Sequence, residues 1–238
     1  GMPPAVGIVL SVLVCTVLGI AIEAVAYRPL RQAASSLVVL ITAIGVSYFL
    51  QNVALLIFGA NTKAFTSVVS VPALKLADGQ INITGETIVT ILSCLVIMAG
   101  LMLFINKTKA GQAMLAVSED KGAAQLMGIN VDGTIALTFA IGSGLAAVAG
   151  VLLCSAYPSL TPYTGSMPGI KAFVAAVFGG IGSIPGAFIG GILLGIIENL
   201  AKAYISSQLS DAIVFSVLII VLLVRPTGIL GKKMTEKV

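Results

Sequence analysis

The chain has 238 residues, of which 58% are hydrophobic and only 9% are charged, with a net charge of +4. This composition and the mean hydropathy of +1.12 exclude an ordinary soluble domain, which is about 25% charged. The charge does not indicate nucleic-acid binding. The sequence has no histidine, the commonest metal ligand and general base, and no P-loop motif. We therefore expect no metal site, no catalytic residues and no nucleotide hydrolysis by this chain.

Long uncharged runs follow one another along the sequence, and a membrane-spanning helix needs about 20 such residues. The runs cover 1–22, 33–62, 87–106, 133–170 and 172–197, with a shorter one at 212–224. They are continuous rather than alternating, which favours helices over a β-barrel. The sequence predicts an all-α, polytopic membrane protein with one transmembrane domain over residues 1–238.

Lysine and arginine residues predict how the chain is threaded through the membrane. Nine of the thirteen lie at Arg28 and Arg31, in the Lys107–Lys121 stretch, and in the tail from Arg225, so we assign that side to the cytoplasm. The expected spans are 5–26, 37–58, 87–105, 134–155 and 212–224. A cytoplasmic loop then covers 106–133, and outer loops cover about 59–86 and 156–170.

Both ends of the segment 171–200 must lie outside for this path to close. The segment is therefore expected to cross twice as short helices, or to enter the membrane and return. Its centre, FGGIGSIPGAFIGG, favours a break, because a proline removes a backbone donor and glycines relax the helix. The residues of interest are Gly179, Gly180, Gly182, Pro185, Gly186 and Gly190. They indicate either close helix packing at GxxxG spacing or the lining of a substrate path.

The same small-residue spacing recurs at Gly142, Ala146 and Gly150, and predicts close packing of an earlier helix. Two carboxylates, Glu23 and Glu198, lie near the ends of apolar runs, where we expect them to reach the interface or to pair locally. Glu198 has Lys202 at i,i+4 spacing. No acidic residue falls in the middle of a span, which argues against a proton- or sodium-coupled carrier.

The polar loop at 106–133 carries signals for a short helix. Ser118 is a candidate N-cap, Glu119 and Asp120 suit the first turn, and Gly128 suits the position just after the end. The pattern predicts a helix over 119–127 with an apolar surface. Such a helix either lies on lipid headgroups or docks into a groove of a soluble partner, and the residues alone leave both interpretations open.

Several stretches resemble one known family. The stretch AVSEDKGAAQLMGINVDGTIALTFAIGSGLAAVAGVL is similar to the cytoplasmic coupling region and following helix of branched-chain amino-acid ABC transporter permeases. The similarity continues in YPSLTPYTGSMPGIKAFVAAVFGGIGSIPGAFIGGILLGIIE, in DAIVFSVLIIVLLVRPTGILG, in RPLR and in ITAIGVSYFLQN.

The resemblance implies a membrane subunit of a binding-protein-dependent importer in the bacterial inner membrane, which is a transporter subunit and not an enzyme. Its implied partners are cytoplasmic ATPase subunits that use ATP and Mg, a related or identical second permease, a periplasmic or extracellular binding protein, and lipid. The implied cytoplasmic coupling helix would contact the ATPase through Ser118, Glu119, Asp120, Ala123, Ala124 and Gly128.

The sequence departs from the family pattern in two respects. Family members usually begin with further helices that include a segment resembling NFAHG, and their loops often carry arginines where this chain has Gln112 and Leu115. Three alternatives to branched-chain amino-acid import also stay open. They are import of urea or short-chain amides by the same architecture, an ATP-independent channel or carrier, and a membrane scaffold.

Overall fold

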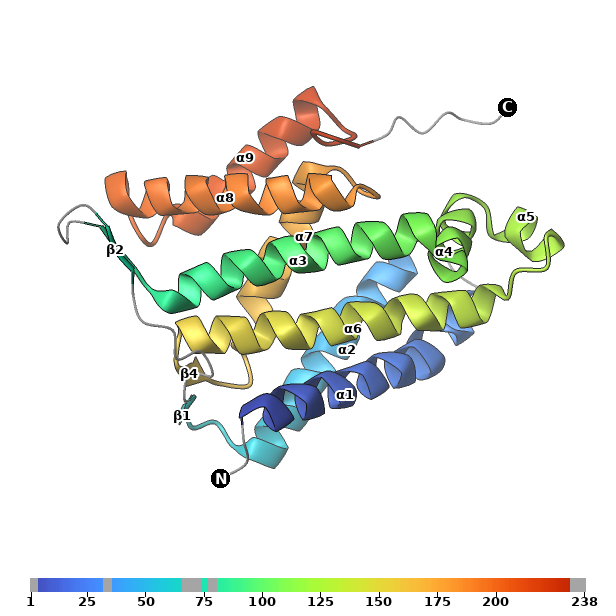
Figure 1. The fold of residues 1–238 in the computed structure, drawn as a ribbon, viewed down its shortest axis with the longest axis horizontal. Helices are drawn as coiled ribbons and strands as arrows, with labels where there is room; N and C mark the ends of the chain where they lie inside the picture. The colour runs from blue at the N-terminus through green and yellow to red at the C-terminus, as the bar shows by residue number, and fades with distance from the viewer. Residues whose placement is uncertain (1–3, 32–35, 66–73, 77–80, 232–238) are drawn as a thin grey trace. The chain divides into compact units, whose positions relative to one another are not determined.

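The computed structural model describes residues 4–31, 36–65, 74–76 and 81–231, most of which are helical (Figure 1). The chain divides into two compact units, Gly1–Tyr163 and Thr164–Val238. Each unit is described by itself. Whether both form the single transmembrane domain expected from the sequence stays a prediction.

Among the described residues, five helices are long and apolar enough to cross a membrane. They cover Ala5–Tyr27, Ile41–Phe58, Gly85–Lys107, Val131–Ala156 and Ile184–Tyr204. Two shorter apolar helices, Ser166–Gly179 and Ser210–Val224, accompany them. These elements confirm the all-α, polytopic membrane fold.

The first unit contains six α-helices within its described residues. Their bounds are α1 Pro4–Ile22, α2 Ser36–Phe58, α3 Gly85–Lys107, α4 Lys109–Glu119, α5 Lys121–Leu126 and α6 Val131–Ala156. The α1 helix continues as a π-helical turn, Glu23–Tyr27, in which Arg28 N donates to Glu23 O over 2.8 Å. A short 3-10 turn, Pro29–Arg31, follows, so the regular helix ends before Pro29, as a proline requires.

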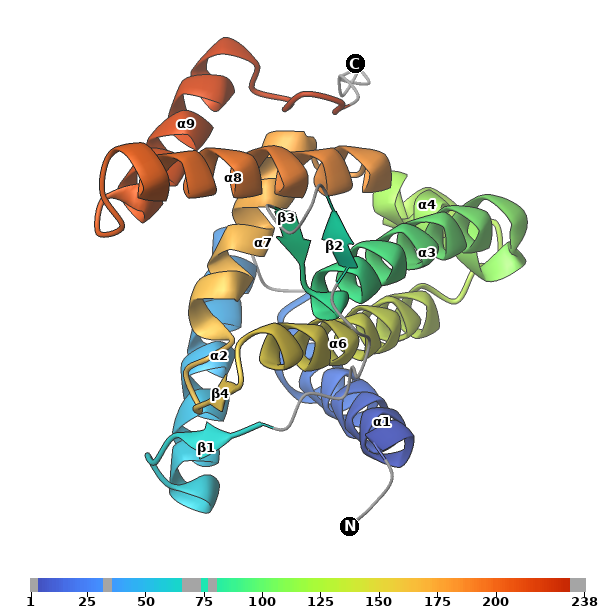
Figure 2. The same ribbon diagram turned by 60° about the vertical axis from the view of Figure 1, so that its left-hand side comes forward.

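Helices α1, α3 and α6 lie side by side in both views (Figures 1 and 2). Small residues permit the close approach of α1 and α6: a Cβ added at Gly19 would overlap the Ser143 side chain, and one at Gly144 would lie 3.1 Å from Thr16 Oγ1. A Cβ at Gly142 or Gly150 would meet nothing within 4 Å. The prediction that these two glycines pack closely is therefore wrong within this chain, because they lie off the face of α6 that meets α1.

The two ends of the first unit are tied by different interactions. At one end, β1 (Lys63–Ala64) pairs antiparallel with β4 (Ser159–Leu160), and β2 (Leu74–Leu76) pairs with β3 (Ile81–Ile83). These short strands lie in loops for which the sequence predicted no strand. At the other end, Arg28 Nη2 lies 3.2 Å from Asp132 Oδ2. The RPLR turn and the start of α6 thus share one end of the unit, as the charge distribution predicts.

The second unit contains α7 (Ser166–Gly179), α8 (Ile184–Tyr204) and α9 (Ser210–Val224). Its core is formed by Val174, Phe178, Leu194 and Val214. The 14 residues of α7 extend only about 21 Å at 1.5 Å per residue, less than the roughly 30 Å of a hydrocarbon core. The turn at 180–183 then leads into the longer α8. The predicted broken helical hairpin is confirmed, with one short arm and one of spanning length.

Glycines set the distance between α7 and α8. A Cβ added at Gly186 would lie 2.5 Å from Gly179 O, and a Cβ added at Gly190 would lie 2.4 Å from Ala175 O of α7. A Cβ at Gly179 would overlap the Gly186 carbonyl. Any larger side chain at these three positions would push the helices apart.

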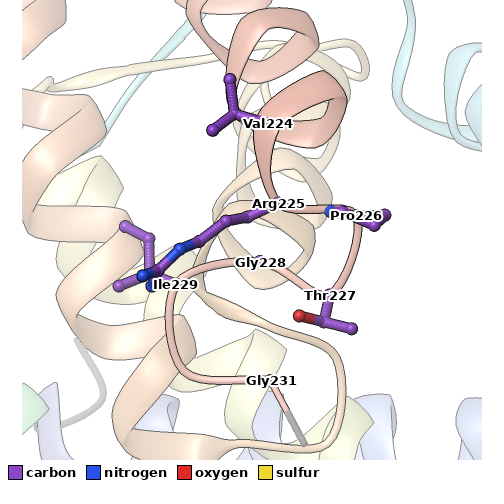
Figure 3. A pocket seen from close by; sticks show the side chains of 7 residues that line it. All are labelled: Val224, Arg225, Pro226, Thr227, Gly228, Ile229 and Gly231. Carbon is purple, nitrogen blue, oxygen red and sulfur yellow. The ribbon is translucent and has the colours of Figure 1, made fainter. Parts of the chain in front are cut away.

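The segment after α9 folds back onto the end of α7, and we call residues 227–231 the C-terminal clasp (Figure 3). Ile229 N donates to Phe178 O over 3.0 Å, and Leu230 N donates to Gly179 O over 2.9 Å. The last carbonyls of a helix have no partner within the helix. The clasp supplies those partners, which a helix end inside a membrane otherwise lacks.

Replacing Gly19 with alanine is expected to loosen the contact between α1 and α6. Overpacking of this kind costs about 1–3 kcal/mol of stability. Gly7→Ala, in the same helix with nothing within 4 Å, should be neutral or stabilising by about 0.5–1 kcal/mol. Thermal denaturation of the purified protein, followed by size-exclusion chromatography, compares the two. Equal melting temperatures for both variants would contradict the packing described here.

Gly228 and Gly182 form a matched pair for testing the clasp, because both have positive φ, +77° and +88°. Alanine at either position costs about 1–2 kcal/mol in backbone strain. At Gly228 the new Cβ would also lie 2.7 Å from the Gly180 backbone, whereas Gly182 has nothing within 4 Å. We expect Gly228→Ala to lower the melting temperature more than Gly182→Ala, and to expose the chain after α9 to proteolysis. The reverse order would show that the clasp does not contribute to stability.

Candidate functional site

The polar loop begins with a tight turn between α3 and α4. Thr108 caps α4, since its Oγ1 accepts from Gly111 N over 3.0 Å and donates to Phe104 O over 2.6 Å. The Gln112 amide donates to Ile105 O over 3.2 Å and to Asn106 O over 3.1 Å, which satisfies carbonyls at the end of α3. A neutral side chain thus holds this turn.

The start of the predicted helix over 119–127 is wrong. Glu119 is the last residue of α4, and Ser118 lies inside α4, where its Oγ donates to Leu115 O over 2.7 Å. Asp120 has extended backbone and caps α5: its Oδ1 accepts from Gly122 N over 2.8 Å and from Ala123 N over 3.0 Å. Asp120 and Ser118 are both good cap residues, and the helical turn through Glu119 leaves Asp120 as the cap.

The end of α5 is as predicted. Gly128 has φ +81°, and the helix closes with the bond pattern of a Schellman motif. Gly128 N donates to Gln125 O over 3.0 Å, and Ile129 N donates to Ala124 O over 3.1 Å. Asn130 then caps α6 by accepting from Gly133 N over 3.0 Å. The six residues of α5 are thus held at both ends by local hydrogen bonds.

One side of this coupling segment, defined as residues 109–128, faces its own subunit and the other faces outward. Val117 and Ala124 are buried, and both α4 and α5 contact α6. Leu126 and Met127, by contrast, are 90% and 83% exposed at the end of α5. The sequence showed these two residues to be apolar, but their exposure depends on which side of a one-and-a-half-turn helix is anchored.

The candidate hairpin residues take different places in the second unit. Gly179, Gly186 and Gly190 form the contact between α7 and α8, and Gly180, with φ +110°, lies against Gly228 and Gly231 of the clasp. Pro185 is in the first turn of α8, after the Ser183 cap, whose Oγ accepts from Gly186 N over 3.1 Å. Gly182 is exposed. The break is thus formed or flanked by Gly179, Gly180, Gly182, Pro185 and Gly186, with Gly182 exposed in its turn, and Gly190 packs further along α8.

A network of four charges joins the other ends of the same three helices. Lys171 Nζ of α7 lies 2.9 Å from Glu198 Oε1 of α8 and 2.7 Å from Asp211 Oδ1 of α9. Lys202 Nζ lies 2.5 Å from the same Glu198 oxygen, which confirms the predicted i,i+4 pair. The sequence did not predict the ion pairs of Lys171, because its partners Glu198 and Asp211 are distant from it in the chain. The network and the clasp fix α7 at opposite ends.

The second predicted carboxylate, Glu23, is only 3% exposed. It lies in the π-helical turn and is buried inside the first unit. Among the described residues there is no group of three or more His, Cys, Asp or Glu side chains suited to a metal.

Comparison with known proteins gives a consistent assignment. Residues 1–222 match the family described as "Branched-chain amino acid transport system / permease component". The chain is 47% identical to the high-affinity branched-chain amino acid transport system permease protein LivH of Escherichia coli K12, over 98% of this chain and 76% of that protein. It is 45% identical to BraD of Pseudomonas aeruginosa, the corresponding permease protein, over 96% and 75%.

A more distant relative is the xylose transport system permease protein XylH of Escherichia coli K12, 29% identical over 58% of this chain and 35% of that protein. No solved structure matches. The family match spans most of the chain, and it includes the coupling segment, the broken hairpin and most of α9. The chain therefore belongs to the permease family of the branched-chain amino acid transport system, as a multi-pass membrane transporter subunit.

Proposed function

We propose that this chain is one membrane half of an ABC importer that moves branched-chain amino acids across the bacterial inner membrane. The observation that carries the proposal is the capped helix α5, which presents Leu126 and Met127 almost fully exposed on a polar loop of a transport permease. An apolar pair at the end of an anchored helix matches the mode in which a helix inserts into a groove of a soluble partner.

The partner of α5 in this proposal is a cytoplasmic ATPase subunit. The partner hydrolyses ATP with Mg, and this chain binds neither. Glu119, Asp120 and Ala123 lie on the exposed side beside Leu126 and Met127, whereas Ala124 is 3% exposed and anchors α5 to its own subunit. Ser118 lies inside α4 and Gly128 ends α5, so both residues serve the local backbone conformation rather than the contact. The proposed contact surface is thus Glu119, Asp120, Ala123, Leu126 and Met127.

Movement of α5 would reach the membrane helices through short, direct connections. Only Gly128, Ile129 and Asn130 separate the end of α5 and its capping residue from α6, and Asn130 caps that helix. The ion pair between Arg28 and Asp132 links the start of α6 to the end of α1. An ATPase that pulls on α5 would therefore displace α6 and α1 together, since those two helices are packed along their length.

The cargo is proposed from the relatives. The proteins about 46% identical over nearly the whole chain are named for branched-chain amino acids, and the xylose permease is matched over a shorter stretch with lower identity. A binding protein would deliver the amino acid to the outer face, and a second permease, identical or related, would complete the membrane part. Lipid surrounds the remaining apolar faces.

Truncating the exposed pair, Leu126→Ala with Met127→Ala, is expected to weaken binding of the ATPase subunit. Full burial of a large apolar side chain contributes about 1.5–3 kcal/mol, so the double variant should lose at least about tenfold in affinity. Copurification of the ATPase with tagged permease and ATP-dependent uptake both report the loss. The isolated subunit should keep its melting temperature, because exposed side chains contribute little to its stability.

Val25→Ala is the matched control, since Val25 is 78% exposed and apolar but lies on the π-helical turn. It should leave ATPase binding unchanged. Equal copurification of the ATPase with the double variant and the control would contradict the docking proposal. In addition, a cysteine at Gln125 should crosslink to the ATPase subunit and should resist an impermeant reagent added outside the cell.

The importer as a whole is tested with the assembled complex in liposomes. We expect ATPase activity that rises when the loaded binding protein is added with leucine, isoleucine or valine, together with uptake of the same amino acid. Urea, acetamide and xylose serve as comparison ligands, and permease without the ATPase is the control for a passive channel. Stimulation by urea or acetamide, or flux without ATP, would replace the proposal by one of the alternatives.

A further inference from the structure

Helix α2 carries a row of polar side chains inside a membrane-spanning segment. Ser47 and Gln51 are four residues apart, as are Tyr48 and Asn52, so each pair shares a face, and the two pairs lie next to each other over about 140° of the helix. None of the spanning window Ile41–Phe58 is buried against the rest of the described chain. We call these four residues the α2 polar stripe. Its side chains are a hydroxyl, a phenol and two amides, and none is charged.

The stripe lies at membrane depth rather than at an interface. Ser47 is the midpoint of Ser36–Phe58, and Asn52 is five residues further on, or about 7.5 Å at 1.5 Å per residue. Half of a hydrocarbon core is about 15 Å thick. With α2 centred in the bilayer, all four side chains are therefore level with lipid tails, where no water is available to bind them.

The stripe satisfies only part of its own hydrogen-bonding capacity. Gln51 Nε2 donates to Ser47 Oγ over 3.2 Å, and Asn52 Nδ2 donates to Tyr48 O over 2.7 Å. Within the described residues, the Tyr48 hydroxyl and the two amide oxygens have no partner. A polar group left unpaired in hydrocarbon is costly, so this face of α2 meets something other than lipid.

We propose that the α2 polar stripe lines the substrate path and hydrogen-bonds the zwitterionic head group of the amino acid in transit. This inference rests on the proposed function for its cargo. The amide and phenol oxygens accept from the ammonium group, and the Gln51 and Asn52 N–H groups and the Tyr48 hydroxyl donate to the carboxylate.

The absence of charge on the stripe suits transit rather than storage. A fixed ion would hold one end of the zwitterion tightly and raise the barrier to its release, whereas permeation requires binding that is favourable but weak. A row of neutral donors and acceptors at successive depths offers equivalent contacts along about 7 Å of the path. The apolar side chain of the cargo needs no polar partner.

Cysteine accessibility tests the stripe directly. In the full complex, with Cys15, Cys94 and Cys154 replaced by alanine, single cysteines are placed at Tyr48, Gln51 and Asn52. A charged, membrane-impermeant thiol reagent should label them at least about tenfold faster than a lipid-facing cysteine, because only an ionised thiolate reacts. Leucine with its binding protein and ATP should slow the labelling.

Phe49→Cys is the matched control for Tyr48 and Gln51. It lies at nearly the same depth as Tyr48 and is 66% exposed against 62%, but its side chain is about 100° further round the helix than Tyr48 and about 160° from Gln51. It should stay unlabelled. Slow labelling of the stripe, equal to that of Phe49→Cys, would overturn the proposal. So would spontaneous crosslinking of the stripe cysteines to the second permease, which would make the stripe a subunit interface.

Transport measurements separate a path residue from a structural one. Gln51→Leu should lower uptake by about tenfold, the loss expected for one hydrogen bond to a charged group, while binding-protein-stimulated ATPase activity continues. Phe49→Leu should leave uptake unchanged. Unaltered uptake by Gln51→Leu would contradict the proposal. The labelling rate without leucine does not depend on which solute is the cargo. If labelling is rapid and is slowed by another solute but not by leucine, the proposed cargo is refuted, while the stripe still lines a transport path.

Discussion

A helix that ends inside a bilayer has carbonyl groups that neither the helix nor water can satisfy. In this chain the helix concerned is α7, an apolar helix of only 14 residues in a chain of membrane-spanning helices. The clasp supplies hydrogen-bond donors to these carbonyl groups, because Ile229 N donates to Phe178 O and Leu230 N donates to Gly179 O. The break, the close approach of α7 and α8, and the return of the chain after α9 all depend on these bonds and on the glycines that let the backbones meet.

The two units solve the same packing problem with different chemistry at their ends. In the first, small residues bring α1 against α6, and the Arg28–Asp132 pair joins them beside the coupling segment. In the second, three glycines set the spacing of α7 and α8, and the Lys171 network ties their far ends to α9. In the first unit, Leu126 of α5 stays exposed and the α2 polar stripe is not buried by these contacts.

Much of this fold could be predicted from the sequence because its signals are local. Uninterrupted apolar runs predicted four of the five helices long enough to span among the described residues, whereas the span expected at 212–224 is the shorter helix α9. Pro185 and its neighbouring glycines predicted the break, and Gly128 predicted the end of α5. The start of α5 could not be predicted, because Ser118 and Asp120 are both suitable caps. In the structure Val117 of α4 is buried and α4 contacts α6, α4 continues through Ser118 to Glu119, and Asp120 is the cap of α5.

The sequence alone determined which segments belong in lipid and which belong in water, because hydropathy and charge set the cost of placing a residue in the membrane. It also determined the family, through motifs that span most of the chain. Only the tertiary structure decided which small residues are contacts: Gly19 and Gly144 pack, whereas Gly142 and Gly150 do not. The same holds for the exposure of Leu126 and for the partners of Lys171. Those properties depend on rotation about helix axes and on pairings distant in sequence, and no local pattern specifies either.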